Sequence, residues 1–399
     1  MNFLKYFKSL WDKDESEATL KAKLEELRQR TPTPVIWLFG KTQSGKTSIV
    51  RFLTGADDAE IGQGFRPTTR YSREYHFPTA DTPLLSFLDT RGLGEPGYDA
   101  AEDIAQFDQK AHVVLVTIKV MDHAQAEVIE QLRKIHAARP DRPMVLVPTC
   151  LHEADPQAQH VQPYPFAKPV LDAPLPENLV RSLEEQKRRF AGLYTHCVPI
   201  DLTRPEEGYT DPNYGGEYLK QVLIELLPEA YRQTLVTLDA ATGELRDLYE
   251  RRATPHILSY AMLATSAGAF PIPGVDVVVL PAIQLRMINY LATLYGRPMT
   301  AQGFMELAAS LGLGMLTRQL ARSMMKFIPG VGSVVAAALA FASTYALGKA
   351  FCYYYSAVHR GHVPKAEVLR EYYEEQLAKA EAFWQARKPG EPGKPGQGG

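Results

Sequence analysis

One stretch of the chain has the residue types and the spacing that bind phosphate. It satisfies the pattern GxxxxGK[ST] between the apolar run VIWLF and the helical pattern SIVRFL. Glycines let successive backbone N–H groups surround phosphates, and the following helix N-terminus adds a positive dipole. We expect nucleotide contacts from the whole run, with the alternative being an ordinary glycine-rich turn: Gly40, Lys41, Thr42, Gln43, Ser44, Gly45, Lys46, Thr47 and Ser48.

Two residues of this run have distinct chemical roles. Lys46 would neutralise the β and γ phosphates during transfer, which makes it the first catalytic candidate. The hydroxyl of Thr47 would coordinate Mg²⁺. The strand before the motif and the helix after it are the context that such a phosphate loop requires.

A second motif, Asp89-Thr90-Arg91-Gly92, directly follows the apolar run LLSFL. Asp89 can hold the Mg²⁺ shell, and the Gly92 N–H can meet a γ phosphate. Between the two motifs, residues 62–70 are flexible in composition and end in hydroxyls, as a switch that closes onto the metal requires. Thr68 is our first choice for this metal ligand and catalytic contact, and Thr69 is the alternative.

At these three motifs the sequence resembles the Era-like bacterial GTPases, whose pattern is a P-loop, a Thr-Thr-Arg switch and a DxxG switch. The resemblance covers roughly residues 34–228. It implies a GTP/GDP switch with Mg²⁺, built from Gly40 to Thr47, Thr68 or Thr69, Asp89 and Gly92.

The chain departs from this family where the guanine base is read. The family's [NT]KxD should follow the run MVLVP, where this chain has Thr149-Cys150-Leu151-His152-Glu153. Thr149 is kept, but the lysine and the correctly spaced aspartate are lost. Glu153, one residue late, is the candidate acceptor for guanine N–H groups, and the alternative is an exposed loop acid. Guanine or adenine preference therefore stays open.

A second departure concerns hydrolysis. Leu93 follows Gly92 where some GTPases orient the attacking water with a glutamine. We expect slow intrinsic hydrolysis, or help from another group. Gln43 in the phosphate loop is a candidate for that group, with a solvated loop side chain as its alternative. An ATPase or small-molecule kinase is disfavoured, because Thr90 rather than an acid follows Asp89.

The elements that must position these residues read as alternating strands and helices from Val35 to about Leu227. Such alternation predicts an α/β fold, a mostly parallel sheet flanked by helices. Residues 70–77 read as a further strand at the edge, and residues 152–178 as a surface excursion. The five strand candidates are VIWLF, LLSFLD, HVVLVTI, MVLVP and HCVPI.

Two helical regions flank this domain. Residues 1–30 predict an amphipathic arm that ends at the prolines of Thr31-Pro32-Thr33-Pro34, so the P-loop domain is assigned to residues 31–229. Residues 230–387 predict an all-helical domain in which Ile-Pro-Gly-Val, at 272–275 and 328–331, separates the helices of two hairpins. It resembles a C-terminal domain of unknown function in some bacterial Era-like GTPases. Residues 388–399 should be disordered.

Composition limits the partners and the compartment. With a net charge of −2 and 23% charged residues, nothing signals nucleic-acid binding. The three cysteines form no CxxC pair and no signal peptide is evident, so a cytoplasmic protein is expected, with inner-membrane association as a variant. His152, His160 and His196 are too scattered along the chain to predict a site.

The remaining question is what residues 257–356 contact. Residues 327–348 contain no charged side chain, and a membrane span requires such an uncharged stretch. Against insertion, these residues are rich in alanine, glycine and serine, which partition weakly into a bilayer. Both a soluble or peripherally docking bundle and hairpins that insert into a bilayer stay open. The leading hypothesis is a regulatory GTPase coupled to a protein partner or membrane. The alternative is a membrane-associated scaffold whose bound nucleotide is structural.

Overall fold

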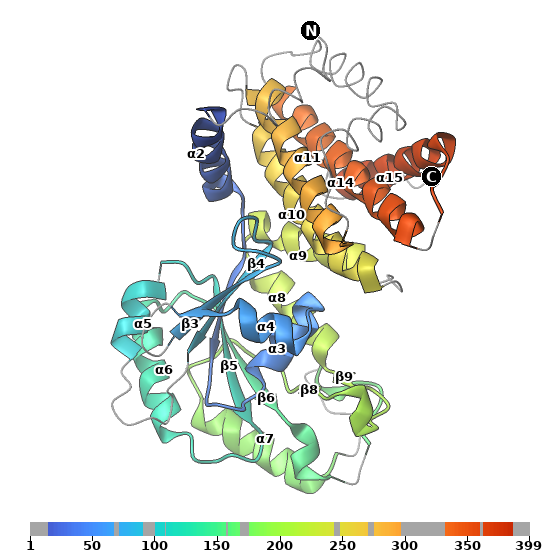
Figure 1. Cartoon of the computed structure of the whole chain (residues 1–399). Helices are drawn as coiled ribbons and strands as arrows, with labels where there is room; N and C mark the ends of the chain where they lie inside the picture. Colours follow the sequence, from blue (N-terminus) through green and yellow to red (C-terminus); the bar gives the residue numbers. More distant parts are fainter. Residues whose placement is uncertain are drawn as a thin grey trace, which may run out of the picture. The chain divides into compact units, whose positions relative to one another are not determined.

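The computed structural model describes residues 15–67, 72–90, 100–107, 109–156, 159–167, 175–242, 248–269, 275–296, 332–359 and 362–385. The chain divides into two compact units (Figure 1). The α/β unit is Thr33–Val236, and the helical unit combines Met1–Pro32 with Thr237–Gly399. Each unit is described by itself.

The α/β unit contains a seven-stranded sheet in the order β2-β3-β4-β1-β5-β6-β7. Strands β4, β1, β5, β6 and β7 are parallel, and β2 and β3 run antiparallel to their neighbours. The predicted α/β class with a mostly parallel sheet is confirmed. The strands are β1 (Val35–Phe39), β2 (Arg66–Pro67), β3 (Ser72–Phe77), β4 (Leu85–Thr90), β5 (Val113–Lys119), β6 (Met144–Thr149) and β7 (His196–Cys197).

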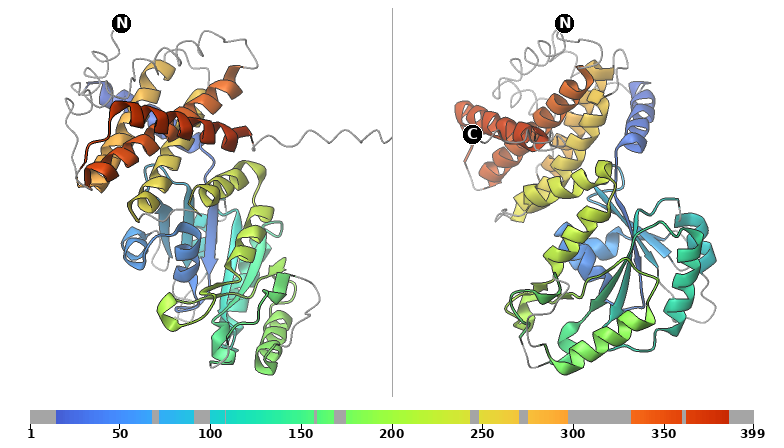
Figure 2. Two further views of the ribbon diagram at one scale, coloured as in Figure 1. Left: turned by 90° about the vertical axis from the view of Figure 1, so that its right-hand side faces the viewer. Right: turned by 180° about the vertical axis from the view of Figure 1, so that it is seen from behind.

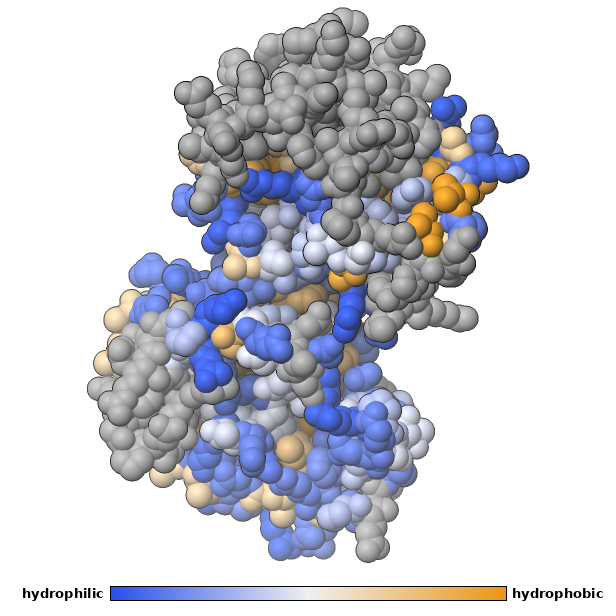
Figure 3. Space-filling view, viewed as in Figure 1, coloured by the Kyte–Doolittle hydropathy of each residue, from blue (hydrophilic) through white to orange (hydrophobic). Residues whose placement is uncertain are grey.

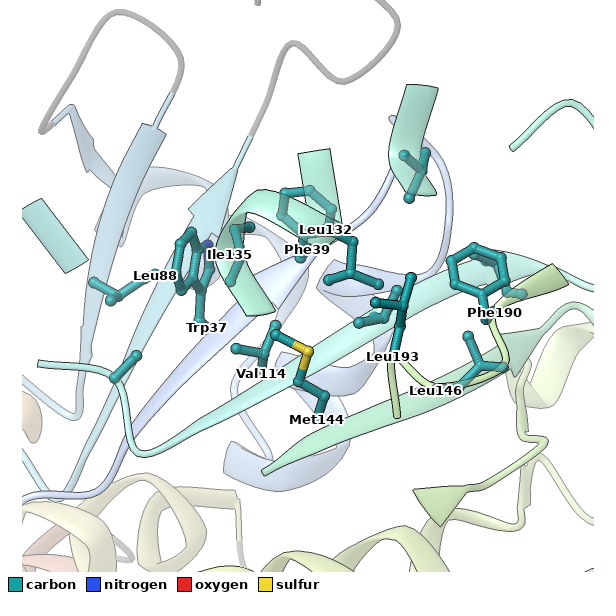
Figure 4. Close-up of a cluster of buried hydrophobic side chains, with 14 of the residues drawn as sticks. Trp37, Phe39, Leu88, Val114, Leu132, Ile135, Met144, Leu146, Phe190 and Leu193 are labelled. Atoms are coloured by element: carbon teal, nitrogen blue, oxygen red, sulfur yellow. The ribbon is translucent and has the colours of Figure 1, made fainter. Parts of the chain in front are cut away.

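Helices cover both faces of this sheet (Figure 2), so its central strands are buried on both sides. On one face, α5 (Ala100–Phe107) and α6 (Ala126–Ala138) enclose a core that contains Phe107. Trp37, Phe39 and Leu132 of this core are shown in Figure 4. The other face carries α3 (Lys46–Thr54) and α8 (Gly216–Leu226). The unit also contains α4 (Asp58–Gly64) and α7 (Glu177–Arg189).

Two details differ from the sequence prediction. The strand expected at the edge, β3, is flanked by β2, because Arg66 and Pro67 pair with Glu74 and Arg73. The expected surface excursion also adds to the core: Tyr164 and Phe166 pack on a cluster containing Val120, Leu151, Leu179, Leu183 and Tyr214. The rings of Tyr164 and Phe166 form an apolar packing surface, which the proline-rich and polar composition of this segment did not predict.

Short elements surround this cluster. The 3-10 helices η1 (Leu151–Ala154), η2 (Pro165–Ala167) and η3 (Pro205–Glu207) lie in the connections, and β8 (Asp201–Leu202) pairs with β9 (Asn213–Tyr214). Leu151 at the start of η1 is buried, so the loop after β6 is fixed by packing. The same loop carries the residues proposed to read the base.

The helical unit is built on α10 (Leu248–Ala269), α11 (Val275–Leu294) and α14 (Gly332–His359). Helix α15 (Ala366–Gln385) packs on α14. Helix α2 (Glu15–Arg30) ends before the prolines, and Leu24 and Leu27 join the core of α10 and α11. Helix α9 (Glu229–Thr242) contains the division point between the units.

Several predictions fall outside the described residues. Thr68, Thr69, Gly92 and Leu93 lie there, as do the second Ile-Pro-Gly-Val segment, most of the first, and the tail at 388–399. The described part of the chain contains one helix long and apolar enough to cross a membrane, Val334–Val358 in α14. Its mean hydropathy is 1.5, and 72% of its most apolar window is buried within the structure.

Candidate functional site

The phosphate loop lies at the carboxyl end of β1 and leads into α3. Gly45 is in the left-handed region at φ 88°, as is Gln43 at φ 62°. A side chain at Gly40 would overlap the carbonyl and hydroxyl oxygens of Thr117, so only glycine fits this position. The structure therefore turns the loop as a backbone cradle requires.

Lys46 lies inside this loop. Its Nζ donates hydrogen bonds to the carbonyl oxygens of Gly40 (2.6 Å) and Lys41 (2.8 Å), and lies 3.8 Å from Asp89 Oδ1. Asp89 reaches it because β4 pairs in parallel with β1, with Leu38 opposite Asp89. The two motifs, far apart in the sequence, therefore meet at one edge of the sheet.

The other residues of the run differ in exposure and contacts. Ser44 is buried, and its hydroxyl lies 2.6 Å from Thr117 Oγ1. Lys41 Nζ donates to Asp122 Oδ2 at 2.8 Å. Burial raises the pKa of the Asp122 carboxyl, but the bond and charge of Lys41 together with the Ala124 N–H lower it by more, so the net pKa is lowered. Thr42, Gln43 and Thr47 are exposed. Thr47 is the second residue of α3, directly after Lys46, and its side chain is exposed.

Magnesium fits the donors present at this edge. Mg²⁺ prefers oxygen ligands and is usually held by one or two protein groups together with substrate phosphates. Asp89 supplies a carboxylate beside the loop and Thr47 a hydroxyl at the start of α3. Among the described residues, no group of three His, Cys, Asp or Glu side chains forms a metal site by itself. These donors are therefore suited to a Mg²⁺ ion that binds together with a nucleotide.

The loop after β6 borders the phosphate loop. Thr149 is buried, and its Oγ1 lies 3.0 Å from the Ser44 carbonyl oxygen and 3.2 Å from that of Ile118. The Thr149 hydroxyl therefore joins this loop to the phosphate loop. Glu153, the predicted acceptor for the base, instead accepts a hydrogen bond of 2.7 Å from Lys119, which raises the lysine pKa.

A cavity of about 190 Å³ opens beside Gly45 and Thr149. Glu153 does not line it, so the structure places the sequence-predicted base reader elsewhere. It is lined by Gly45, Ser48, Thr149, Cys150, His152, Ile200, Asp201, Leu202, Thr203 and Glu207. Because Gly45 belongs to both the cavity and the phosphate loop, a nucleotide on that loop can place its base here.

Sequence reasoning missed the polar residues of this cavity. Asp201 has a side chain only 3% exposed and accepts hydrogen bonds from the His152 backbone N–H (2.7 Å) and from Nδ1 of its ring (2.8 Å). His160 Nε2 lies 3.2 Å from the same carboxylate. The two histidines were judged too far apart in sequence to form a site. Folding of the segment after β6 against β8 brings them together, and no spacing rule signals this.

Comparisons with known proteins agree with this geometry. A family model described as 50S ribosome-binding GTPase matches residues 35–149, and one described as a domain of unknown function (DUF697) matches residues 236–381. Residues 35–149 therefore form a P-loop GTPase domain, which is followed by a DUF697 region.

Individual relatives were also found. Magnetosome membrane protein 22 of Magnetospirillum gryphiswaldense is 34% identical over 135 residues, which are 32% of this chain and 69% of that protein. Translation initiation factor IF-2 of Rickettsia prowazekii is 28% identical over 29% of this chain and 13% of its own length. The crystal structure of a bacterial selenocysteine-specific elongation factor EF-Sec covers 49% of this chain and 28% of its own, at 18% identity and a TM-score of 0.31.

Proposed function

We propose that this chain, which belongs to the same protein family as magnetosome membrane protein 22 of Magnetospirillum gryphiswaldense, is a GTP-dependent switch with slow Mg²⁺-dependent hydrolysis. The observation that carries the proposal is the convergence of Lys46 and Asp89 at the phosphate loop, where their side chains lie 3.8 Å apart. These groups supply the charge complement of a nucleoside triphosphate with its metal.

Each residue of the loop has a role in this proposal. Lys46, now bonded to carbonyl oxygens of its own loop, turns its ammonium to the β and γ phosphates. The N–H groups of the loop and the N-terminus of α3 hold the same anion. Thr47 and Asp89 would hold Mg²⁺, and the ion would supply positive charge beside the phosphates. These residues bind and orient the nucleotide and form no covalent bond to it.

Slow hydrolysis is proposed because Leu93 follows Gly92, where some GTPases orient the attacking water with a glutamine. Gln43 is the candidate on the described part of the loop, where its side chain is exposed and its backbone is held at φ 62°. A non-glycine residue at positive φ is strained, and such strain persists where the surrounding structure demands it. We propose that Gln43 contacts the attacking water, directly or through a partner.

We further propose that nucleotide binding rearranges residues 61–70 and 89–98, which include the end of α4, β2 and the end of β4, and alters what the helical unit contacts. Thr68 or Thr69, and the Gly92 N–H, are the groups that would close onto Mg²⁺ and the γ phosphate. Support for this comes from Asp89, which connects the metal side of the site to the end of β4, from which the second segment begins.

The test is titration of the purified full chain with GTP, GDP and ATP in the presence of Mg²⁺, beside Lys46→Ala and the surface control Lys110→Ala. We expect guanine nucleotides to bind, Lys46→Ala to weaken binding at least 100-fold by loss of the phosphate charge partner, and the control to match wild type. Unchanged binding by a folded Lys46→Ala variant would contradict the proposal. Phosphate release measured under multiple turnover then gives the hydrolysis rate.

A second candidate function, membrane association through residues 257–356, is favoured by α14. The Val334–Val358 segment is long enough to span a bilayer, although much of it is buried against other helices. On the face shown in Figure 3, apolar residues also gather on the helical unit. We propose peripheral docking of this unit. Alkaline carbonate extraction of cell membranes tests it: release into the supernatant is expected, and retention would indicate insertion.

A further inference from the structure

The proposed function leaves the reading of the base unexplained, because the chain lacks the usual aspartate. The position of that aspartate, three residues after the threonine in [NT]KxD, is taken here by His152. His152 lines the cavity beside the phosphate loop, whereas Glu153 is bonded to Lys119. The cavity volume of about 190 Å³ is smaller than the roughly 300–1,000 Å³ of pockets that enclose whole ligands, so it suits one ring system.

The hydrogen bonds around Asp201 determine which nitrogen of a neutral His152 ring carries the proton. A carboxylate only accepts hydrogen bonds, so the ring nitrogen Nδ1, 2.8 Å from Asp201 Oδ2, must carry a proton. In a neutral imidazole the other nitrogen, Nε2, is then an acceptor. The described structure gives Nε2 no hydrogen-bond partner, and about a quarter of the side chain, 27%, is exposed.

Asp201 itself is unsuited to read the base directly. Its carboxylate is 3% exposed and already receives the His152 backbone N–H and ring N–H, with His160 Nε2 3.2 Å away. The His160 ring is held between Tyr209 and Tyr214, with ring centroids 5.1 and 4.4 Å away. These contacts fix the acid as a support for His152.

We infer that His152 Nε2 is the specificity-determining acceptor for the N1–H of guanine, and that Asp201 is a positioning residue that holds His152 in this tautomer. This inference rests on the proposed nucleotide binding. Adenine has an acceptor at its own N1, so a fixed acceptor opposite that atom separates the two bases. The two oxygens of a carboxylate can accept hydrogen bonds from both N1–H and the 2-amino group of guanine. The single acceptor of His152 contacts N1–H alone, so the 2-amino group does not contribute to recognition.

The experiment measures dissociation constants of GDP and ADP with Mg²⁺ by calorimetry on the full chain. Wild type is expected to prefer GDP. Because one neutral hydrogen bond is lost, His152→Ala should weaken GDP binding roughly 3- to 10-fold and leave ADP binding unchanged. The control His196→Ala, a histidine on β7 outside the cavity, should match wild type. An unchanged preference for GDP in His152→Ala would overturn the inference.

Asp201→Asn tests the positioning role, because an amide can accept or donate and no longer imposes one tautomer. It should reduce the preference for GDP in the wild-type background and have no further effect on that preference in His152→Ala. A second loss in the double variant would overturn the role of Asp201.

Inosine diphosphate provides a test on wild type that no folding defect can obscure. It keeps N1–H and lacks the 2-amino group, so it should bind within about threefold of GDP if only one acceptor reads the base. A tenfold weaker affinity would overturn the inference in favour of a two-oxygen reader. If wild type binds GDP and ADP equally, the base reading fails while the nucleotide site stands. If it binds neither, both fail.

Discussion

Trp37 Nε1 donates a 2.8 Å hydrogen bond to Thr90 Oγ1, so the central strand β1 holds the residue that follows Asp89. Thr90 Oγ1 in turn donates to Asp103 Oδ2 at 3.2 Å, and Ser72 donates to the other oxygen of Asp103. All four side chains are buried. This series of hydrogen bonds connects β1, β3, β4 and α5 next to Asp89, the proposed metal ligand.

Thr90→Val tests this buried chain. The substitution keeps the shape but leaves the indole N–H and one Asp103 oxygen with a lost partner, so we expect the α/β unit to lose about 2–4 kcal/mol of unfolding free energy. Urea denaturation measures the loss. Thr195→Val removes the hydroxyl of an exposed residue that bonds the Met144 carbonyl oxygen, and should lose about 1 kcal/mol or less. Equal losses in the two variants would show that the buried hydrogen bonds of Thr90 stabilise the unit no more than the hydrogen bond of Thr195 does.

Gly40→Ala should abolish nucleotide binding. An added methyl group would overlap the backbone carbonyl of Thr117, which β5 holds in place, so the phosphate loop must shift. Calorimetric titration with GDP measures the effect. Lys110→Ala is the control, because its side chain is exposed and outside the proposed switch segments, and it should bind as wild type does. Retained affinity in Gly40→Ala would mean that the loop tolerates a different path.

The ion pair between Lys349 and Glu250 predicts an asymmetry in the helical unit. The lysine side chain is 5% exposed and the glutamate 30%, so the lysine depends more on its partner. Glu250→Gln strands a buried charge and should cost about 3 kcal/mol, whereas Lys349→Met leaves a partly hydrated carboxylate and should cost about 1 kcal/mol. Urea unfolding of both variants gives the order. The reverse order would contradict the assignment of burial.

His256 predicts a pH dependence in the same unit. Burial lowers the pKa of the His256 ring to about 3, from the ordinary value of 6.5 that it has in the unfolded chain. The lowered pKa means that the unfolded state binds the proton first. The contribution is therefore fully present above pH 6.5 and falls as pH decreases toward 3. Between pH 7.5 and 5.5 the loss from this group is about 1.4 kcal/mol.

Urea midpoints of wild type and His256→Gln at the two pH values provide the measurement. Glutamine does not titrate, so the variant should lose about 1.4 kcal/mol less than wild type over this interval. Parallel shifts in both proteins would show that His256 is protonated while folded.

The sequence predicted the sheet well because its strands are continuous apolar runs and its phosphate loop has fixed spacing. Runs such as VIWLF and HVVLVTI can only be buried strands beside helices, and the structure has them as β1 and β5. Short strands gave no such signal: the two residues of β2 displace β3 from the edge. Their pairing depends on the fold around them and not on their own pattern.

The base side of the site was the least predictable part. Glu153 was favoured for its charge and near-correct spacing, but Lys119 on the neighbouring strand is close enough to bind it. Asp201 comes about 50 residues after His152 in the chain, and only the folded segment between them places the two side chains 2.8 Å apart. Long-range pairing of this kind leaves no local periodicity to read.

The packing of α2 on α10 and α11 has a consequence for synthesis. Leu24 and Leu27 belong to the same core as Ala264 and Ile283, and Thr31 Oγ1 lies 2.8 Å from Ser266 Oγ. The helical unit is thus discontinuous in the chain. As the polypeptide leaves the ribosome, α2 emerges first and must wait, unpartnered by this core, while more than 200 residues of the α/β unit are made. A gene fragment that starts at residue 237 would encode a bundle lacking part of its own interior.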